Sequence, residues 1–216
     1  MPVVILNLFQ YLIYMIIKSI LETSYSGMFK VAPEEGSAFY VRKDYLPDGF
    51  FERIDVGSEF NEAETDSLLD AGLTCAVELK AVAYLARAEQ SRFGLTRKLI
   101  EKKYDKKYVE AALSYLERRG YLSDLRYATA WLNTRCINHY EGRSRLSAEL
   151  ASRGISRDVA ATALDEFFTE HNEDEICVKA YKKLSKNKSG DKLTAALIRL
   201  GFSAKQIRIA EETIQA

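Results

Sequence analysis

The sequence predicts an all-α protein whose body consists of three tandem three-helix modules, preceded by a small N-terminal β-hairpin. Apolar residues recur at the helical period of i, i+3, i+4 and i+7 from Cys75 to the C-terminus. In addition, one helix–loop–helix pattern occurs three times at nearly equal spacing. Modules of this kind bury their apolar faces partly against their neighbours, so we expect a curved, solenoid-like body.

The bulk composition is that of an ordinary globular protein, but its charge is unevenly distributed. The 216 residues are 47% hydrophobic and 29% charged, with a formal net charge of zero. Residues 1–75 carry 5 Lys/Arg and 12 Asp/Glu, a net of −7, whereas residues 76–216 carry 26 and 19, a net of +7. A basic body of this kind either faces an anionic partner or presents ordinary solvated helix faces.

Residue types that carry enzyme chemistry do not form a recognisable motif. The three cysteines, Cys75, Cys136 and Cys177, are too far apart for a zinc site and favour a reduced, cytosolic protein. His139 and His171 do not form a metal-ligand pair, and the sequence has neither a phosphate-binding loop nor a nucleophile elbow. We therefore expect no enzyme activity, no catalytic residue, no metal and no cofactor.

The apolar N-terminal segment, residues 1–27, is expected to lie outside the fold. Residues 3–21 are strongly apolar but include Asn7, Gln10 and Lys18, which makes them a marginal membrane span. No basic region precedes them and no clear cleavage site follows, so they do not resemble a signal peptide. A membrane anchor and a translation start at Met28 are the alternatives.

The β-hairpin is expected between residues 38 and 56. Residues 38–41 and 50–56 are rich in aromatic and β-branched types, and a Pro-Asp-Gly turn signal separates them at 47–49. Residues 61–71 resemble a short helix that ends near Gly72.

The repeated pattern predicts a helix end, an apolar plug and a new helix. In each copy a Leu lies four residues before a Gly or Lys, and an apolar residue and a helix-starting residue follow. This order fits a helix that ends in a left-handed residue and is followed by a capped helix. The left-handed positions are Lys103, Gly154 and Gly201, the plugs are Tyr104, Ile155 and Phe202, and the helix starts are Asp105, Ser156 and Ser203.

Spacing sets the module boundaries. The left-handed positions lie 51 and 47 residues apart, which leaves room for three helices in each module. Lys103 should be mildly strained because its Cβ disfavours that conformation, and Ser203 with Gln206 forms a capping box. Chance similarity of helix ends is the alternative. The expected parts are 1–27, 28–75 and 76–216, with modules at about 76–120, 121–170 and 171–216.

Three stretches of the body resemble the RecX family of RecA regulators. Residues 120–128, GYLSDLRYA, resemble the family's central motif of Gly, aromatic, Leu or Ile, any residue, Asp and an aromatic–Ala pair. Residues 84–92 resemble its first helix, where Arg-x-x-Ser is usual, and residues 142–155 resemble its next block. The resemblance covers about residues 76–216. Gln90 departs from it, because a basic residue is common there, and so does the apolar N-terminal segment.

The resemblance implies a regulator that acts by binding. Proteins of the RecX type bind RecA, lie in the groove of the filament that RecA forms on single-stranded DNA, and limit filament growth and strand exchange. For this chain it implies a cytoplasmic monomer without a cofactor or small-molecule substrate, acting in homologous recombination, DNA repair and the SOS response. A nucleic-acid-binding helical protein independent of RecA is the alternative, and a membrane-tethered regulator or an enzyme of unrecognised type is a third.

Basic residues of the body are the candidates for contact with RecA or DNA. Arginine can bind carboxylates and phosphates through two parallel hydrogen bonds. The alternative is a solvated helix face with internal pairs such as Glu149–Arg153, and this alternative is favoured for the lysines because no aromatic residue is placed for base stacking. The candidates are Arg118, Arg119, Arg126, Arg143, Arg145, Arg153, Lys98 and Lys102.

Other residues of the motifs are expected to have structural roles. Asp124 is predicted to be the N-cap of the helix that carries Arg126. Tyr121, Tyr127 and Trp131 are predicted to pack in a core, which we favour over a stacking platform. The structural set is Gly120, Tyr121, Asp124, Tyr127, Trp131, Gly154 and Gly201.

Overall fold

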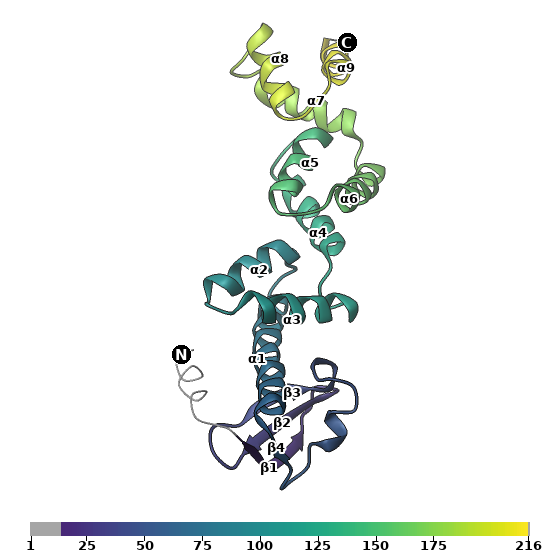
Figure 1. The fold of residues 1–216 in the computed structure, drawn as a ribbon. Helices are drawn as coiled ribbons and strands as arrows, with labels where there is room; N and C mark the ends of the chain where they lie inside the picture. The colour runs from purple at the N-terminus through teal and green to yellow at the C-terminus, as the bar shows by residue number, and fades with distance from the viewer. Residues whose placement is uncertain (1–13, 216) are drawn as a thin grey trace. The chain divides into compact units, whose positions relative to one another are not determined.

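The computed structural model describes residues 14–215, which contain nine α-helices and four β-strands (Figure 1). The predicted all-α class is therefore confirmed in part: the protein is mostly helical, but it also contains a four-stranded sheet. The described residues form two compact units, the first from residues 14–84 and 98–119 and the second from residues 85–97 and 120–215. Within this part of the chain, no helix is both long and apolar enough to span a bilayer.

The first unit contains a four-stranded sheet in place of the predicted hairpin. Its strands are β1 (Met15–Glu22), β2 (Met28–Pro33), β3 (Phe39–Arg42) and β4 (Glu59–Phe60). Their order across the sheet is β3-β2-β1-β4, and all three pairings are antiparallel (Figure 1). The four strands of the sheet therefore lie between residues 15 and 60 of the sequence.

Strand β1 corrects the expectation that residues 1–27 lie outside the fold. It is an inner strand, paired with β2 on one side and β4 on the other, and its Met15 and Ile17 are 2% and 1% exposed. A short apolar run does not by itself distinguish a buried strand from the end of a membrane span, which explains the error. Residues 1–13 of the predicted leader lie outside the described residues.

The predicted hairpin between residues 38–41 and 50–56 is wrong. Strand β3 pairs with β2, and residues 50–56 do not form a strand. Phe51–Arg53 is a 3-10 turn, flanked by Phe50 and Ile54, whose side chains enter the core of the sheet. The aromatic and apolar side chains that indicated a strand are buried from an irregular segment. Gly49, with a φ of +74°, does lie in a turn.

The sequence indicated a short helix that ends near Gly72, but helix α1 (Glu62–Leu85) continues through this glycine to Leu85. A Cβ on Gly72 would lie 2.7 Å from Cδ2 of Phe39 on β3. The glycine therefore permits close packing of the helix on the sheet, where Leu68 and Ala71 of α1 join the same core. The long helix was divided too early because this glycine marks a packing contact and not a helix end.

A buried ion pair fastens β3 to α1. Nε and Nη2 of Arg42 donate to the two carboxylate oxygens of Glu78 at 2.8 and 2.6 Å, and both side chains are almost fully buried. The hydroxyl of Tyr45 donates to Glu78 Oε2 at 2.8 Å, and Nη1 of Arg42 donates to the carbonyl of Ser26 at 2.7 Å. The Arg42 guanidinium also lies 4.6 Å from the ring centre of Tyr115. Both charges are satisfied, so loss of either partner would leave an uncompensated buried charge.

The remaining helices follow without further strands. Helix α2 (Arg92–Glu101) belongs to the second unit at its start and to the first at its end, and α3 (Lys106–Arg118) completes the first unit. In the second unit, α4 and α5 pack on α6, and α8 and α9 pack on α7. The bounds are α4 (Asp124–Cys136), α5 (Arg143–Ser152), α6 (Arg157–Glu170), α7 (Glu173–Leu184), α8 (Gly190–Arg199) and α9 (Ala204–Gln215).

The three predicted loops share one backbone conformation. Gly154 and Gly201 have φ values of +79° and +94°, and Lys103, at +68°, is the one non-glycine residue with a positive φ among residues 14–215. In each loop the N–H of the apolar plug donates to the carbonyl of the leucine five residues earlier, as in a Schellman motif. These bonds are Tyr104 N to Leu99 O, 3.3 Å, Ile155 N to Leu150 O, 3.2 Å, and Phe202 N to Leu197 O, 3.3 Å.

A side-chain cap follows each loop, as expected. Asp105 accepts from the N–H of Lys107 at 2.7 Å, and Ser156 accepts from that of Val159 at 3.4 Å. Ser203 and Gln206 form the predicted capping box, with each side chain accepting from the backbone N–H of the other. The nine helices of residues 14–215 can be grouped as α1–α3, α4–α6 and α7–α9. That these groups are three copies of one module stays a prediction.

Removal of residues 1–27 should unfold the first unit. A chain that begins at Met28 lacks an inner strand whose buried side chains each contribute roughly 1.5–3 kcal/mol. We expect its urea unfolding curve to lose the transition of the first unit, whereas deletion of residues 1–13 alone, the control, leaves β1 in place. An unchanged transition in the shorter chain would show that β1 is dispensable.

Substitution of Lys103 by Gly should stabilise the protein by about 0.5–1 kcal/mol, because glycine adopts a positive φ without steric cost. Urea unfolding measures the change. The matched control is Lys102→Gly, one residue earlier and just after the end of α2, where φ is not positive, and it should be neutral or destabilising. A destabilised Lys103→Gly variant would contradict the assignment of strain to this loop.

Candidate interaction site

The central motif, residues 120–128, is a short loop followed by the first residues of α4, and Arg126 holds that loop together. Gly120 adopts a φ of +74°, with nothing within 4 Å of the position a Cβ would take, so the backbone conformation alone requires glycine. The Arg126 guanidinium donates to the carbonyls of Gly120 and Tyr121 at 2.9 and 3.0 Å and to Glu89 Oε1 at 2.9 Å. This arginine, a predicted contact residue, therefore has a structural role.

Asp124 caps a different helix from the one predicted. The N-cap of α4 is Ser123, whose hydroxyl accepts from the N–H of Arg126 at 3.3 Å. Asp124 is the first residue of α4, and its Oδ1 accepts from the N–H of Arg92 at 2.7 Å. Arg92 begins α2, so the aspartate satisfies a free N–H at the start of a neighbouring helix. Asp124 was correctly predicted to cap a helix, but the local sequence did not indicate that the capped helix would be α2.

We define the first junction as the set of contacts between residues 89–94 and residues 120–154, all within the second unit. Two further contacts belong to it. The hydroxyl of Ser91 donates to the carbonyl of Arg153 at 3.0 Å. A Cβ on Gly154 would lie 2.2 Å from Cβ of Phe93, so the two backbones approach closely. Gly154 thus has two reasons to be glycine, its positive φ and this packing contact.

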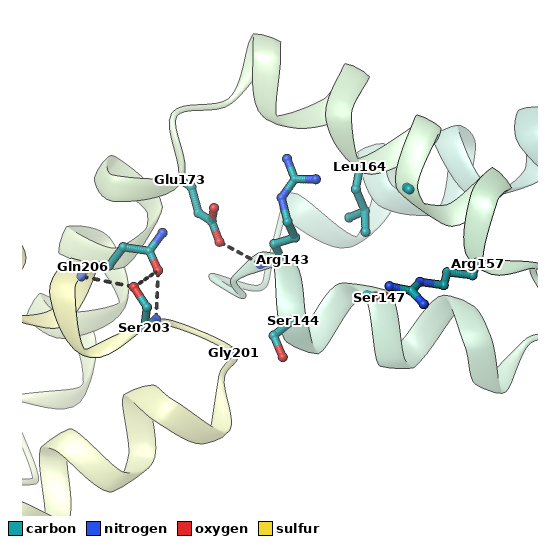
Figure 2. Close-up of a pocket in the computed structure, with 10 residues that line it drawn as sticks. Arg143, Ser144, Ser147, Arg157, Leu164, Glu173, Gly201, Ser203 and Gln206 are labelled. Carbon is teal, nitrogen blue, oxygen red and sulfur yellow. Dashed lines mark hydrogen bonds between the residues drawn. The ribbon is translucent and has the colours of Figure 1, made fainter.

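Contacts of a similar kind form the second junction, which we define as the contacts of residues 142–145 with residues 173–203. Glu173, the first residue of α7, accepts from the N–H of Arg143, the first residue of α5, at 2.8 Å (Figure 2). The N–H of Gly142 donates to the carbonyl of Leu200 at 2.8 Å. A Cβ on Gly201 would lie 2.4 Å from the backbone nitrogen of Arg145.

The two junctions correspond in their helix caps, but Ser91 donates through its side-chain hydroxyl whereas Gly142 donates through its backbone N–H. Asp124 and Glu173 each begin one helix and cap another, whereas Ser91 and Gly142 each precede the capped helix. Ser91 and Gly142 both donate to the residue before a left-handed glycine, which is Arg153 in one case and Leu200 in the other. The carboxylates that begin α4 and α7 are therefore equivalent features of the fold.

Three other candidate arginines also have partners in the second unit. Arg143 donates to Asp165 at 2.6 Å and lies 5.0 Å from the ring centre of Phe168. Arg145 and Arg153 pair with the two carboxylate oxygens of Glu149 at 2.6 and 2.7 Å. The hydrogen bond from Arg153 holds the pKa of Glu149 below its ordinary value. The predicted Glu149–Arg153 pair is confirmed.

The basic residues of the first unit that were predicted to contact RecA or DNA differ in their contacts within the chain. Arg118, Arg119 and Lys102 are exposed, and within residues 14–215 none of them has an ion pair or a side-chain hydrogen bond. Lys98 lies 5.5 Å from the ring centre of Tyr84. Four of the eight basic candidates therefore lie in the first unit and four in the second.

The three aromatic residues of the motif differ in burial. Tyr127 and Trp131 are partly buried against the core formed by α4, α5 and α6, as predicted. Arg153 lies 4.5 Å from the ring centre of Trp131. Tyr121 is 61% exposed, so its predicted core position is wrong. Leu122, the next residue, is the side chain that this loop buries.

An open cleft of about 440 Å³ lies beside the second junction (Figure 2). Arg143 and Arg157 supply its positive charges, Ser144 and Ser147 line it with hydroxyls, and Leu164 is apolar. Arg157 was not among the predicted contact residues. Within residues 14–215, no three His, Cys, Asp or Glu side chains are grouped so that they could hold a metal ion.

The prediction also missed a lysine-rich segment at residues 182–192. Its sequence, KKLSKNKSGDK, contains five lysines and one acidic residue, Asp191. All five lysines are exposed, and none of them forms an ion pair with another described residue. The density of lysine in the sequence could have identified this segment. The lysines are Lys182, Lys183, Lys186, Lys188 and Lys192.

Comparison with known proteins identifies the family. The family model described as RecX, second three-helix domain, matches residues 123–164. Regulatory protein RecX of Treponema pallidum (strain Nichols) is 37% identical over 139 residues, which cover 63% of this chain and 85% of that protein. The chain belongs to the RecX family. Regulatory protein RecX of Neisseria meningitidis serogroup C is 29% identical over 136 residues, 61% of this chain and 86% of that protein.

Solved structures of RecX proteins share the fold. A crystal structure of regulatory protein RecX aligns with a TM-score of 0.73 at 21% identity, covering 92% of this chain and 99% of that one. The crystal structure of RecX from Lactobacillus salivarius aligns with a TM-score of 0.58 at 21% identity, covering 66% of this chain and 97% of that one. The resemblance seen in the sequence is therefore confirmed.

Substitution of Asp124 by Ala should destabilise the second unit by about 1–2 kcal/mol, because an N–H at the start of α2 loses its acceptor. The control is Asp158→Ala, which removes an exposed carboxylate from the first turn of α6. Urea unfolding of both variants gives the comparison. Equal costs would show that the Asp124 carboxylate, as acceptor for the Arg92 N–H, contributes nothing beyond a general helix-end charge.

Proposed function

We propose that this chain binds RecA and the RecA filament on single-stranded DNA, and modulates, mostly by inhibition, the ATPase and strand-exchange activities of RecA. The observation that carries the proposal is the 37% identity to a protein named Regulatory protein RecX, over 85% of its length. That name supports a regulatory role. RecA as the partner follows from the family resemblance of residues 120–128 and 142–155.

The proposed mode of action is contact and not catalysis. We propose a monomer in the cytoplasm that needs no cofactor and acts in recombination, DNA repair and the SOS response. We also propose that its helices are three copies of one module. Three loops of one conformation and two junctions with equivalent contacts support this. Repeated modules present an extended surface, which suits a partner that is itself a filament.

All eight basic candidates remain proposed contacts, but they differ in how a test can use them. Arg118, Arg119 and Lys102 are exposed and unpaired within residues 14–215, so their removal should leave the fold intact. Arg126, Arg143, Arg145 and Arg153 hold intramolecular contacts, so a variant of any of them would mix a structural effect with a binding effect. Lys98 interacts with Tyr84.

The test is the single-stranded-DNA-dependent ATPase of RecA, measured with the full chain at well below one copy per RecA. We expect clear inhibition, and we expect the variant with Arg118→Ala and Arg119→Ala to need about tenfold more protein for the same effect, since charge-assisted contacts contribute 1–3 kcal/mol. The matched control removes two exposed lysines elsewhere, with Lys179→Ala and Lys205→Ala.

Two results would contradict the proposal. A folded chain without effect on the ATPase would exclude regulation through the filament. Binding of DNA in the absence of RecA, with a steep loss of affinity as salt rises, would then favour the direct nucleic-acid-binding alternative. Equal potency of the arginine variant and its control would remove Arg118 and Arg119 from the contact surface.

A further inference from the structure

The cleft beside the second junction is bounded by one face of α5 and one face of α6 (Figure 2). Ser144 and Ser147 are three residues apart on α5, and residues at this spacing share a helix face. Arg157, Ala161 and Leu164 recur at i, i+4 and i+7 on α6 and therefore share a face as well. The volume of about 440 Å³ is within the usual range of small-molecule sites, roughly 300–1,000 Å³.

Several side chains that line the cleft have hydrogen-bond donors without acceptors in the described part of the chain. Arg157 has no ion pair or side-chain hydrogen bond with another residue of 14–215, and the hydroxyls of Ser144 and Ser147 do not donate to any of these residues. Gln206 on α9 accepts from the N–H of Ser203 through Oε1, so its amide Nε2 remains a donor. Donors from α5, α6 and α9 are therefore available to one acceptor that has several oxygen atoms.

The charge of the cleft favours an anion. Of the ten residues that line it, two are arginines and one is acidic. The acidic residue, Glu173, already accepts from the N–H of Arg143, and the Arg143 guanidinium donates to Asp165 at 2.6 Å. Arg143 and Arg157 are also the first residues of α5 and α6, so two helix N-termini add partial positive charge. Arg157 is the guanidinium that remains available to a ligand.

The first junction shows that an open polar cleft is not a requirement of the fold. The second residue of α2 is Phe93, which packs against Gly154. The second residue of α5 is Ser144, which lines the cleft. A hydroxymethyl group in place of a phenyl ring leaves space beside the start of α5 and supplies a hydroxyl in place of an apolar contact.

We propose that this cleft binds the phosphate group of a small molecule. The guanidinium of Arg157 and the hydroxyls of Ser144 and Ser147 donate to the phosphate oxygens, and the organic part of the ligand lies against Leu164. None of these four residues is among the contacts proposed for RecA. The site therefore goes beyond the proposed regulation of RecA and does not depend on it.

Phosphate fits these donors better than a carboxylate does. One arginine can satisfy both oxygens of a carboxylate through two parallel hydrogen bonds, which leaves no acceptor for the serines. A phosphate monoester has three terminal oxygens and a charge of about −1.5 to −2 at pH 7. A nucleic-acid strand is disfavoured, because none of the ten lining residues is aromatic and single-stranded sites usually stack bases on aromatic side chains.

The test is an amide chemical-shift titration of the isotope-labelled full chain with AMP, inorganic phosphate and adenosine at constant ionic strength. We expect AMP and phosphate to bind, with shifts at Ser144, Ser147 and Arg157, and we expect adenosine to bind at least about tenfold more weakly than AMP. Arg157→Gln should weaken AMP binding at least about tenfold, because a charge-assisted hydrogen bond is lost. The matched control is Arg87→Gln, which removes an exposed arginine outside the cleft and should leave the affinity unchanged.

A second variant tests the shape of the cleft. Ser144→Phe gives α5 the residue that α2 has at its second position, so it should block the ligand without unfolding the chain. We expect loss of AMP binding with an unchanged midpoint of thermal unfolding. The matched control, Thr162→Phe, places the same side chain at an exposed position of α6 that does not line the cleft, and it should bind normally.

Tighter binding of AMP than of phosphate would support an organic ligand, whereas equal affinities would assign the phosphate site to the free anion. Three outcomes overturn the proposal. Neither AMP nor phosphate binds, or Arg157→Gln binds both as tightly as the unmodified chain, or an oligothymidine binds through Arg157 while AMP and phosphate do not. In the last case the cleft is a nucleic-acid surface. We expect Arg157→Gln to inhibit the RecA ATPase as the unmodified chain does, so failure here is distinguishable from failure of the proposed regulation of RecA.

Discussion

The interaction on which the second unit depends is a carboxylate that begins one helix and caps another. The first N–H groups of any α-helix lack partners inside that helix, and burial without an acceptor is costly. In this chain Asp124 and Glu173 supply the acceptors for α2 and α5 from the helices that follow them, at 2.7 and 2.8 Å. Each capped helix is therefore complete only when the next two helices are in place, and this couples neighbouring parts of the chain.

Close approach of backbones at the junctions makes that interaction geometrically feasible. Side chains at Gly154 and Gly201 would collide with Phe93 and with the backbone of Arg145, at 2.2 and 2.4 Å. The same glycines adopt the positive φ values that end α5 and α8. One small residue thus ends a helix and admits the neighbouring loop, which explains why a single loop pattern recurs along the body. Arg126 strengthens the first junction by binding Glu89 and two carbonyls of the central loop.

Features that depend on local sequence could be predicted, and features that depend on distant partners could not. The left-handed conformation of Lys103, the capping box of Ser203 and the Glu149–Arg153 pair all involve residues within a few positions, and all are confirmed. Strand β1 was missed because an apolar run gives the same signal in a sheet as in a leader. The role of Gly72 depends on Phe39, and that of Asp124 depends on Arg92, more than thirty residues away in each case.

The same distinction applies to the candidate contact residues. A run of arginines indicates a basic surface, but the sequence does not show which guanidinium groups are already engaged. Arg126, Arg145 and Arg153 are engaged with Glu89 and Glu149, whereas Arg118 and Arg119 have no such partner among residues 14–215. Structure therefore separates residues that hold the fold from residues that remain available to a partner. Membership of the RecX family then gives these exposed residues a proposed partner.

Residue-resolved amide hydrogen exchange tests the central claim most directly. First-turn amides normally exchange freely, so protection of the Arg92 and Arg143 N–H groups would report the carboxylates that accept from them. In a chain with Asp124→Ala and Glu173→Ala, we expect both amides to exchange about fivefold faster, which corresponds to the ~1 kcal/mol of a typical cap. Amides in the middle of α4 should change much less. Unchanged exchange at Arg92 and Arg143 would contradict the account, because the two carboxylates would then not hold the junctions.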